Sequence, residues 1–306
     1  MQAAGKERFA AIDIGTNSTR LLIAEVEGGR VIPRFFALRM TRVGEGVARG
    51  EGLRPEPVAR TLRALQEFGA LARRYGVSCM RVVATSAVRE APNAPGFLKQ
   101  VREEAGFEVD VISGEEEAYL SYLGACRALP GVAEGVVVDI GGGSTEFTFP
   151  ARPGAPASGL RCVSVPLGAV RLTERPALLS ELLAPMKAVL DEIALRRERN
   201  LIGVGGTITT LAAVDQALAT YDPDRVHGYR LTRDAVERIL FHLAAKNKDE
   251  RKNVPGLQPE RADIIVAGTT ILWAILGYLQ IPEITVSEAD LLHGIILELS
   301  QPRKGS

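Results

Sequence analysis

The chain has 306 residues, of which 46% are hydrophobic and 24% charged, so it is long enough for two domains of about 150 residues, each with its own core. Its 37 basic and 37 acidic residues cancel, and this balance speaks against a nucleic-acid or anionic-membrane partner. The three cysteines, Cys79, Cys126 and Cys162, form no Cys-x-x-Cys pair. This speaks against a disulfide framework or a zinc ribbon and favours a reducing, cytoplasmic setting.

The first half of the chain predicts an α/β arrangement. Apolar runs at Phe9–Ile12 and Leu21–Val26 flank a glycine-containing turn and predict a β-hairpin, and a strand-like stretch follows at Val31–Leu38. Apolar residues at three- and four-residue steps predict a helix over Pro55–Tyr75, and Met80–Ala84 predicts a short strand. The remaining predicted elements of this half are a helix near Pro95–Ala105, a strand at Val109–Ile112 and a helix from Ser113 to about Ala128.

The second half repeats this order after a connection at Pro130-Gly131. Another hairpin, with strands at Val136–Val138 and Phe147–Phe149, leads into a Pro/Gly loop at Pro150–Gly159. A strand at Leu201–Val204 then runs directly into a helix, and the part after Leu231 is mainly helical with a short strand at Ile284–Ser287. The uncharged run Ile264–Leu279 is shorter than the ~20 residues of a membrane span and predicts a buried helix.

The turns of the two hairpins carry the same motif. Asp13–Thr19 (DIGTNST) and Asp139–Thr145 (DIGGGST) agree at five of seven positions. A turn of glycines and small hydroxyl residues presents backbone N–H groups, which are suited to phosphate oxygens. Either turn alone would also fit an ordinary β-turn, but the repetition favours a phosphate site. The predicted phosphate-binding residues of the turns are Asp13, Gly15, Thr16, Asn17, Ser18, Gly141, Gly142, Gly143, Ser144 and Thr145.

The position after each motif differs, with Arg20 in the first copy and Glu146 in the second. Asp139 and Glu146 flank their turn on its two strands, so a hairpin places them across from each other. Paired carboxylates suit Mg²⁺ or another divalent cation, which keeps waters and bridges to substrate phosphates. The alternative is that Glu146 is a solvated strand residue.

Two further groups of residues are candidates for binding phosphate: Thr85, Ser86 and Arg89 in the first half, and Gly205 and Gly206 in the second. Arg89 follows Thr85-Ser86, and its guanidinium suits bidentate binding of a phosphate; the alternative is a solvated arginine on a first helical turn. Gly205-Gly206 opens a helix whose N-terminus suits a further phosphate, or else allows close packing of strand and helix.

An acidic triplet supplies the candidates for a catalytic base. Because the three histidines are isolated, a phosphate hydrolase built on this chain would need a carboxylate base. Glu115-Glu116-Glu117 begins a helix, where the helix dipole alone also explains acidic residues. The residues alone do not choose among the three.

Together these motifs resemble the exopolyphosphatase/guanosine-pentaphosphate phosphatase family, in the superfamily of actin and the sugar kinases. The matching segments are Ala11–Ser18, Ala84–Ala91, Ile112–Ala118, Val138–Glu146, Gly203–Thr207, Pro255–Leu257 and Arg261–Asp263. The resemblance implies that Glu117 is the base that activates water and that Asp139 and Glu146 bind magnesium. It implies that Arg89 and both turns bind phosphate. Longer members carry a further C-terminal domain of the His-Asp type, and we expect this chain to be a short form without it.

These observations lead to one set of expectations. The fold is expected to be a duplicated, actin-like (ribonuclease H-like) α/β fold of two domains, 1–126 and 127–306, with the active site in the cleft between them and the C-terminal helix packing back on their interface. The expected activity is hydrolysis of the terminal phosphate of inorganic polyphosphate, of guanosine pentaphosphate, or of both. A non-catalytic sensor of guanosine polyphosphates and a nucleotide-dependent kinase are the alternatives. We expect no nucleic-acid or membrane partner, and the oligomeric state stays open, with a homodimer as one option.

Overall fold

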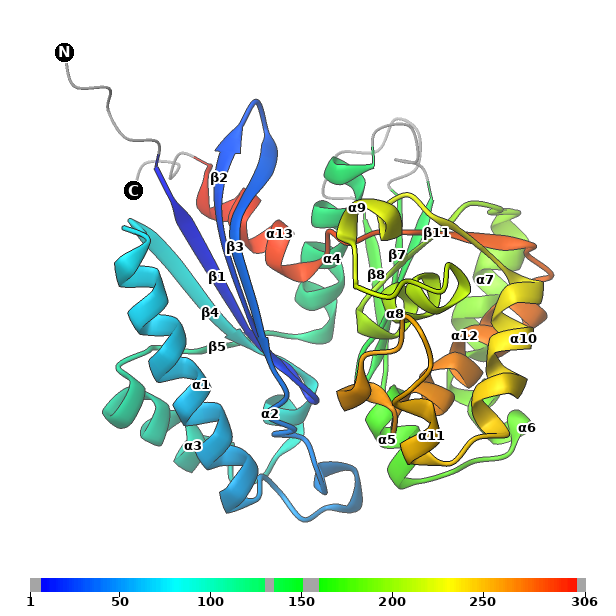
Figure 1. The fold of residues 1–306 in the computed structure, drawn as a ribbon, viewed down its shortest axis with the longest axis horizontal. Coiled ribbons are helices and arrows are strands. Elements are labelled where there is room, and N and C mark those ends of the chain that lie inside the picture. Colours follow the sequence, from blue (N-terminus) through cyan, green and yellow to red (C-terminus); the bar gives the residue numbers. More distant parts are fainter. Residues whose placement is uncertain (1–6, 130–134, 151–159, 302–306) are drawn as a thin grey trace. The chain divides into compact units, whose positions relative to one another are not determined.

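The computed structural model describes residues 7–129, 135–150 and 160–301, and the predicted Pro130-Gly131 connection and nearly all of the predicted Pro150–Gly159 loop lie outside them. The chain divides into two compact units (Figure 1). Unit 1 consists of Met1–Ser113 with Leu291–Ser306, and unit 2 is Gly114–Asp290. Each unit has its own sheet and its own helices.

This division differs from the expected boundary between residues 126 and 127. Helix α4 (Gly114–Ala128) belongs to unit 2, where it packs on the second sheet and the Thr148 hydroxyl donates to the Ala118 carbonyl at 3.0 Å. Helix α13 (Leu291–Leu299) belongs to unit 1, where it packs on the first sheet. Both assignments depend on contacts between segments far apart in the sequence, which local patterns do not reveal.

The sheet of unit 1 has the strand order β3-β2-β1-β4-β5. Its strands are β1 (Phe9–Ile14), β2 (Thr19–Glu27), β3 (Arg30–Arg39), β4 (Cys79–Ala84) and β5 (Asp110–Val111). The first three are antiparallel neighbours, whereas β4 runs parallel to β1 and β5 runs parallel to β4. The helical segments are Val47–Arg49, α1 (Pro55–Arg74), α2 (Ser86–Glu90) and α3 (Ala94–Gln100), which a wider helical turn continues over Val101–Ala105.

The sheet of unit 2 repeats this topology in the order β8-β7-β6-β9-β11, with β10 added at the far edge. Its strands are β6 (Val136–Ile140), β7 (Thr145–Phe149), β8 (Arg161–Val165), β9 (Leu201–Val204), β10 (Arg230–Thr232) and β11 (Glu283–Val286). Again three antiparallel strands precede strands parallel to the first. The repeated order confirms the predicted duplicated, actin-like α/β fold.

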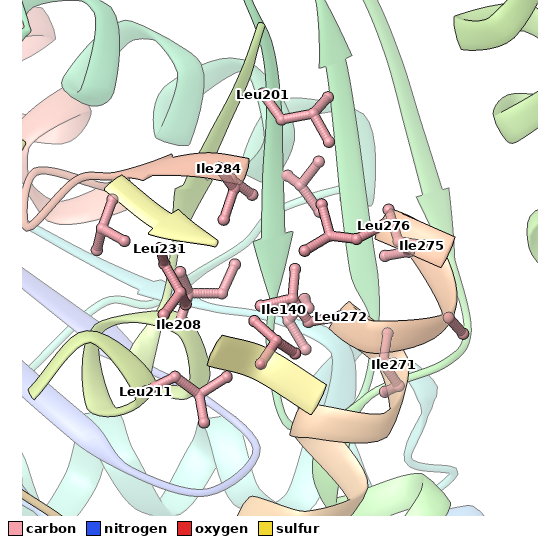
Figure 2. Packing of buried hydrophobic residues seen from close by; sticks show 14 of the residues in the cluster. Ile140, Leu201, Ile208, Leu211, Leu231, Ile271, Leu272, Ile275, Leu276 and Ile284 are labelled. Carbon is pink, nitrogen blue, oxygen red and sulfur yellow. The ribbon is translucent and has the colours of Figure 1, made fainter. Parts of the chain in front are cut away.

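The helices of unit 2 after α4 cover much of its sequence. They are α5 (Ala169–Glu174), α6 (Leu179–Leu183), α7 (Lys187–Arg196), α8 (Gly206–Asp215), α9 (Pro223–Val226), α10 (Arg233–Ala244), α11 (Lys248–Arg251) and α12 (Ile265–Leu279), with single turns at Ala184–Met186 and Pro259–Arg261. The core lies between the sheet and several of these helices: Figure 2 shows Ile140 of β6 beside Leu272 of α12. Helix α12 is therefore the predicted buried helix, and no helix among the described residues is long and apolar enough to cross a membrane.

A buried carboxylate makes unit 1 sensitive to acid. Glu25 of β2 is buried and accepts hydrogen bonds from Arg34 Nη2 at 2.6 Å and from Arg8 Nε at 3.1 Å. Because these hydrogen bonds, first from Arg34 and then from Arg8, favour the charged form, the pKa of Glu25 falls from 4.5 to about 2. A lowered carboxyl pKa contributes stability that is present above pH 4.5 and is lost as the pH falls towards 2.

We therefore expect Glu25→Gln to weaken unit 1 most at neutral pH. The urea midpoint of the variant should lie below that of the wild type at pH 7, and the gap should narrow steadily between pH 4.5 and pH 2.5. Parallel unfolding titrations of both proteins at each pH measure this gap. A gap of constant size across the range would show that the ion pairs do not contribute.

Candidate active site

The first hairpin turn is closed tightly by its own backbone. Strand pairing places Asp13 opposite Arg20, and the N–H of Gly15 donates to the Ser18 carbonyl at 3.0 Å. A Cβ on Gly15 would lie 3.0 Å from that carbonyl oxygen, so the turn leaves little room for a side chain at this position. The tight closure places the intervening residues, Thr16 and Asn17, at the tip.

The carbonyl groups of this tip accept hydrogen bonds from the segment that follows β3. Arg42 N–H donates to the Asn17 carbonyl and Gly44 N–H donates to the Thr16 carbonyl, both at 2.9 Å. The N–H groups of Thr16, Asn17 and Ser18 donate to no other residue in the described part of the chain. The side-chain Nδ2 of Asn17 is also buried without a hydrogen-bond partner there. The tip thus carries several donors whose needs an anion would satisfy.

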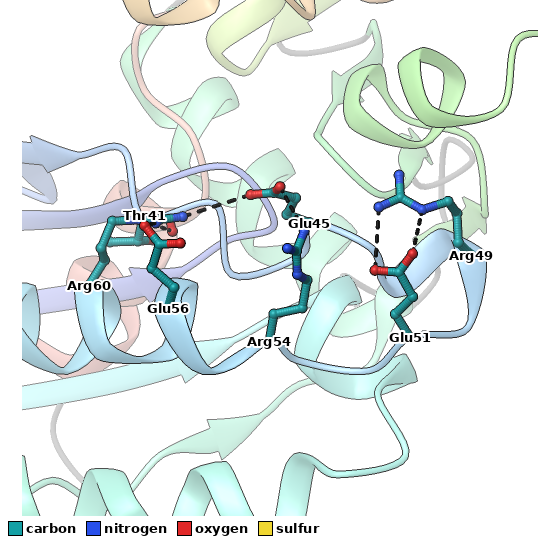
Figure 3. A network of polar contacts seen from close by, with 7 residues as sticks. All are labelled: Thr41, Glu45, Arg49, Glu51, Arg54, Glu56 and Arg60. Atoms are coloured by element: carbon teal, nitrogen blue, oxygen red, sulfur yellow. Dashed lines mark hydrogen bonds and ion pairs between the residues drawn. The ribbon is translucent and has the colours of Figure 1, made fainter.

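A charged network braces the segment that holds the tip (Figure 3). Arg60 of α1 donates to the Thr41 carbonyl at 3.1 Å and pairs with Glu56 at 3.0 Å. Glu45 pairs with Arg54 at 3.0 Å and lies 3.8 Å from Arg60. Single exposed pairs contribute little to stability, whereas several charges linked in a network contribute more.

The second turn repeats this construction. Gly141 N–H donates to the Ser144 carbonyl at 3.0 Å, as Gly15 does to Ser18. The carbonyls of all three glycines accept hydrogen bonds from the start of α5. These bonds come from Ala169 N to Gly141 O at 2.9 Å, from Val170 N and Arg171 N to Gly142 O at 2.8 and 3.1 Å, and from Arg171 Nε to Gly143 O at 2.8 Å. As in unit 1, the N–H groups at the tip (Gly142, Gly143 and Ser144) donate to no other described residue.

The threonine that ends each motif has a structural contact instead of an open hydroxyl. Thr145 is fully buried and its hydroxyl donates to the Leu167 carbonyl at 2.6 Å. Its counterpart Thr19 lies 2.9 Å from the Thr41 hydroxyl. In each unit the threonine ties the hairpin to the segment after the third strand. The Thr145 hydroxyl is therefore engaged within unit 2, and the phosphate contact predicted for this residue stays a prediction.

The residues that follow β4 lie beside the first turn. The parallel pairing of β1 and β4 sets Ile14 against Ala84, and Thr85 N–H donates to the Ile14 carbonyl at 3.3 Å. The Ser86 hydroxyl donates to Glu90 at 2.7 Å, and Arg89 Nη1 donates to the Ile112 carbonyl at 2.8 Å. Unit 1 thus brings Thr85, Ser86 and Arg89 to the same end of the sheet as its turn.

Gly205 and Gly206 occupy the matching place after β9 in unit 2. Gly205 has φ +87°, and a Cβ on it would lie 2.5 Å from Asp139 Oδ1. A Cβ on Gly206 would lie 2.2 Å from the guanidinium nitrogens of Arg261, so this arginine covers the start of α8. Both glycines are required by the close approach of charged side chains.

The two carboxylates predicted to bind metal lie directly opposite each other. Asp139 of β6 pairs in register with Glu146 of β7, and cross-strand partners in an antiparallel pair share one face of the sheet. Asp139 Oδ2 accepts from the Ser121 hydroxyl at 2.9 Å, and Glu146 Oε1 accepts from the Ser164 hydroxyl at 2.8 Å. Sequence reasoning missed both serines.

At the same place unit 1 has an ion pair. Arg20 donates to Asp13 Oδ2 from Nε at 3.0 Å and from Nη2 at 2.7 Å. Arg20 thus balances the charge of the Asp13 carboxylate within its own hairpin, and the phosphate contact predicted for Asp13 stays a prediction. Only the hairpin of unit 2 offers two acidic side chains.

This donor set fits a magnesium ion. Two hard carboxylates on one face suit Mg²⁺, which takes one or two protein carboxylates and completes its shell with water and phosphate oxygens. Among the described residues, no group of three or more His, Cys, Asp and Glu side chains is clustered for metal binding, so a dedicated all-protein site of the zinc type is not present there. His227, for example, lies between two backbone groups, Ala128 O and Glu288 N, each 3.2 Å from a ring nitrogen.

Helix α4 distinguishes among its three glutamates. Ser121, which holds Asp139, lies four residues after Glu117, and residues four apart share one face of a helix. Glu116 and Glu117 are half-buried, whereas Glu115 is exposed, so burial sets only Glu115 apart. Burial raises the pKa of the Cys162 thiol in β8, and the negative charge of Glu115 raises it further. Glu115 therefore lies near enough to Cys162 to interact with it electrostatically. Of the three glutamates, Glu117 is the one in helical register with the residue that contacts Asp139.

The sequence matches the Ppx/GppA phosphatase family over residues 22–302. The chain belongs to this family. The bifunctional 3-dehydroquinate synthase/phosphatase of Fusobacterium nucleatum is 35% identical over 312 residues, which cover 94% of this chain but only 46% of that protein. Exopolyphosphatase 2 of Mycobacterium tuberculosis is 34% identical over 319 residues, which cover 96% of this chain and 98% of that protein.

The Ppx/GppA relationship extends to the three-dimensional structure. The crystal structure of an exopolyphosphatase from Cytophaga hutchinsonii is similar with a TM-score of 0.85 and 26% identity, and the similarity covers 98% of this chain and 100% of that one. The resemblance inferred from the motifs is therefore confirmed at the level of family and fold. The individual site residues of this Ppx/GppA chain stay predictions.

Proposed function

We propose that this chain is a phosphohydrolase that removes the terminal phosphate from inorganic polyphosphate. The observation that carries the proposal is the pair of carboxylates, Asp139 and Glu146, next to a glycine turn whose tip N–H groups have no partner in the described residues. The names of the Mycobacterium and Cytophaga relatives give the same substrate for those proteins. A carboxylate pair beside anion donors suits a metal-assisted reaction at a phosphate group.

Both units carry groups that suit phosphate. In unit 1 the tip N–H groups, the Asn17 side-chain amide and the Arg89 guanidinium would hold phosphate oxygens. In unit 2 the N–H groups of the glycine turn would do the same, and Asp139 and Glu146 would hold the magnesium ion. When bound, this ion would neutralise charge on the terminal phosphate oxygens.

Glu117 would act on the attacking water. Its carboxylate would accept a hydrogen bond from the water and take a proton as the water oxygen forms a bond to the terminal phosphorus. The bridging P–O bond breaks on the opposite side, so that orthophosphate and a polyphosphate shortened by one unit are released. The carbonyl groups of each turn tip already accept hydrogen bonds from neighbouring segments, so the tip N–H groups would be preorganised for phosphate oxygens.

Guanosine pentaphosphate is the second candidate substrate. It presents the same terminal phosphoanhydride, and the family that the chain belongs to is described as Ppx/GppA phosphatases. Nothing in the turns or the carboxylate pair selects between a nucleotide and a linear chain, because both would contact the same terminal phosphate.

A phosphate-release assay tests the proposal. The purified chain is incubated with polyphosphate of several lengths or with guanosine pentaphosphate, each with Mg²⁺ and with a chelator. We expect Mg²⁺-dependent release of orthophosphate from polyphosphate. Tight binding of guanosine polyphosphates without release would identify a sensor instead, and transfer of phosphate from ATP to a sugar would identify a kinase.

A further inference from the structure

One row of polar residues crosses the antiparallel part of the second sheet. Asp139 of β6 is opposite Glu146 of β7, and Glu146 is in turn opposite Ser164 of β8. Helix α4 packs on these three strands and brings Ser121 to Asp139. Each acidic side chain in the row thus accepts a hydrogen bond from a serine hydroxyl, and the two serines come from different elements.

The corresponding row of unit 1 serves as an internal comparison. There Asp13 is opposite Arg20, and Arg20 is opposite Leu38 of β3. The apolar Leu38 stands where unit 2 has Ser164. Where the second residue of the row is an arginine, it holds the aspartate itself, and no hydroxyl is present at the third position. The serine thus accompanies the change from an ion pair to a pair of carboxylates.

Two carboxylates opposite each other repel, and without partners their side chains would turn apart. A hydroxyl that donates to one oxygen of a carboxylate stabilises the charge and fixes the side-chain rotamer. Ser121 is only 1% exposed, so its hydrogen bond to Asp139 is protected from competition by water. On the other side, Asp139 Oδ1 is close to the backbone of Gly205, which further limits the rotation of this carboxylate.

We propose that Ser121 and Ser164 are positioning residues that hold Asp139 and Glu146 ready for the divalent cation. The inference rests on the proposed function, because it assumes that these carboxylates bind the ion. Groups that hydrogen-bond to metal ligands from outside the coordination shell typically contribute 10–100-fold to metal affinity or activity. The serines fulfil this role without contacting substrate.

The test compares Ser121→Ala and Ser164→Ala with Thr269→Val. Thr269 is a buried residue of the same unit whose hydroxyl donates to the Ile265 carbonyl at 2.7 Å within α12, so its loss removes a buried hydroxyl that bonds within its own helix. Isothermal titration measures Mg²⁺ binding to each chain without substrate. Phosphate release at increasing Mg²⁺ then gives the half-saturating concentration.

We expect each serine variant to bind Mg²⁺ roughly 10–100-fold more weakly and to need correspondingly more Mg²⁺ for turnover. Ser164→Thr keeps a hydroxyl at a half-buried strand position and should bind Mg²⁺ like the wild type, as should Thr269→Val. Unchanged Mg²⁺ binding in both alanine variants would overturn this inference but not the proposed function. An equal loss of Mg²⁺ affinity in Thr269→Val would have the same consequence. A wild-type chain that neither binds Mg²⁺ nor releases phosphate would overturn the proposed function together with it.

Discussion

Replacing Glu117 with glutamine is expected to lower the rate of phosphate release by ~10²–10⁴-fold, the contribution typical of a general base. Glutamine has nearly the same shape but cannot take a proton from water. Because Glu117 would contact the attacking water and not the phosphate chain, binding of polyphosphate should be retained. Steady-state phosphate release and a separate binding titration with the variant measure the two effects.

The neighbouring Glu115 provides a matched control. It lies on the same turn of α4, but it is exposed and interacts electrostatically with Cys162. Glu115→Gln removes the same charge from the same helix end, so both variants lose any favourable interaction with the helix dipole. Full activity in Glu115→Gln and loss in Glu117→Gln would assign the base, whereas an equal, small effect of both would show that the charge acts only on the helix.

The repeated motif allowed the main features of the fold to be predicted. A hairpin with Asp before the turn and Glu after it fixes the register, so the opposition of Asp139 and Glu146 followed from the spacing alone. The buried helix at Ile265–Leu279 followed from an apolar run too short for a membrane. These predictions succeeded because each depends on residues close together in the sequence.

The features that were missed depend on distant contacts. The hydroxyl of Thr145 looked available for phosphate, but Leu167 of the segment after β8 accepts its hydrogen bond. Strand β10 has only three residues, too few for a periodic signal, and it exists because it pairs with β11. Ser121 could have been found as the residue one helical turn after Glu117, but its partner Asp139 is visible only in the folded structure.

The other large effect is expected from converting the second hairpin to the pattern of the first. In Glu146→Arg the new guanidinium should pair with Asp139 as Arg20 pairs with Asp13. This change removes one carboxylate and neutralises the other, so Mg²⁺ binding should fall by more than ~100-fold, beyond the loss typical of an outer hydrogen-bond partner. The equivalent position in unit 1 already accommodates an arginine with 19% of its side chain exposed, so the strand pairing itself is compatible with the substitution.

Glu146→Gln separates the two parts of this effect, because it removes the charge of Glu146 and introduces no cation beside Asp139. We expect Mg²⁺ binding in the order wild type, Glu146→Gln, Glu146→Arg, measured by isothermal titration, with thermal denaturation confirming that each variant is folded. If a folded Glu146→Arg chain bound Mg²⁺ as tightly as the wild type, the metal would have to be held elsewhere. If the arginine and glutamine variants bound Mg²⁺ equally weakly, the new arginine would not pair with Asp139 as Arg20 pairs with Asp13. The loss of affinity would then be due to the removal of Glu146 alone. The expected order would instead show that a single position, opposite the aspartate, determines whether a copy of this hairpin holds an ion pair or a metal.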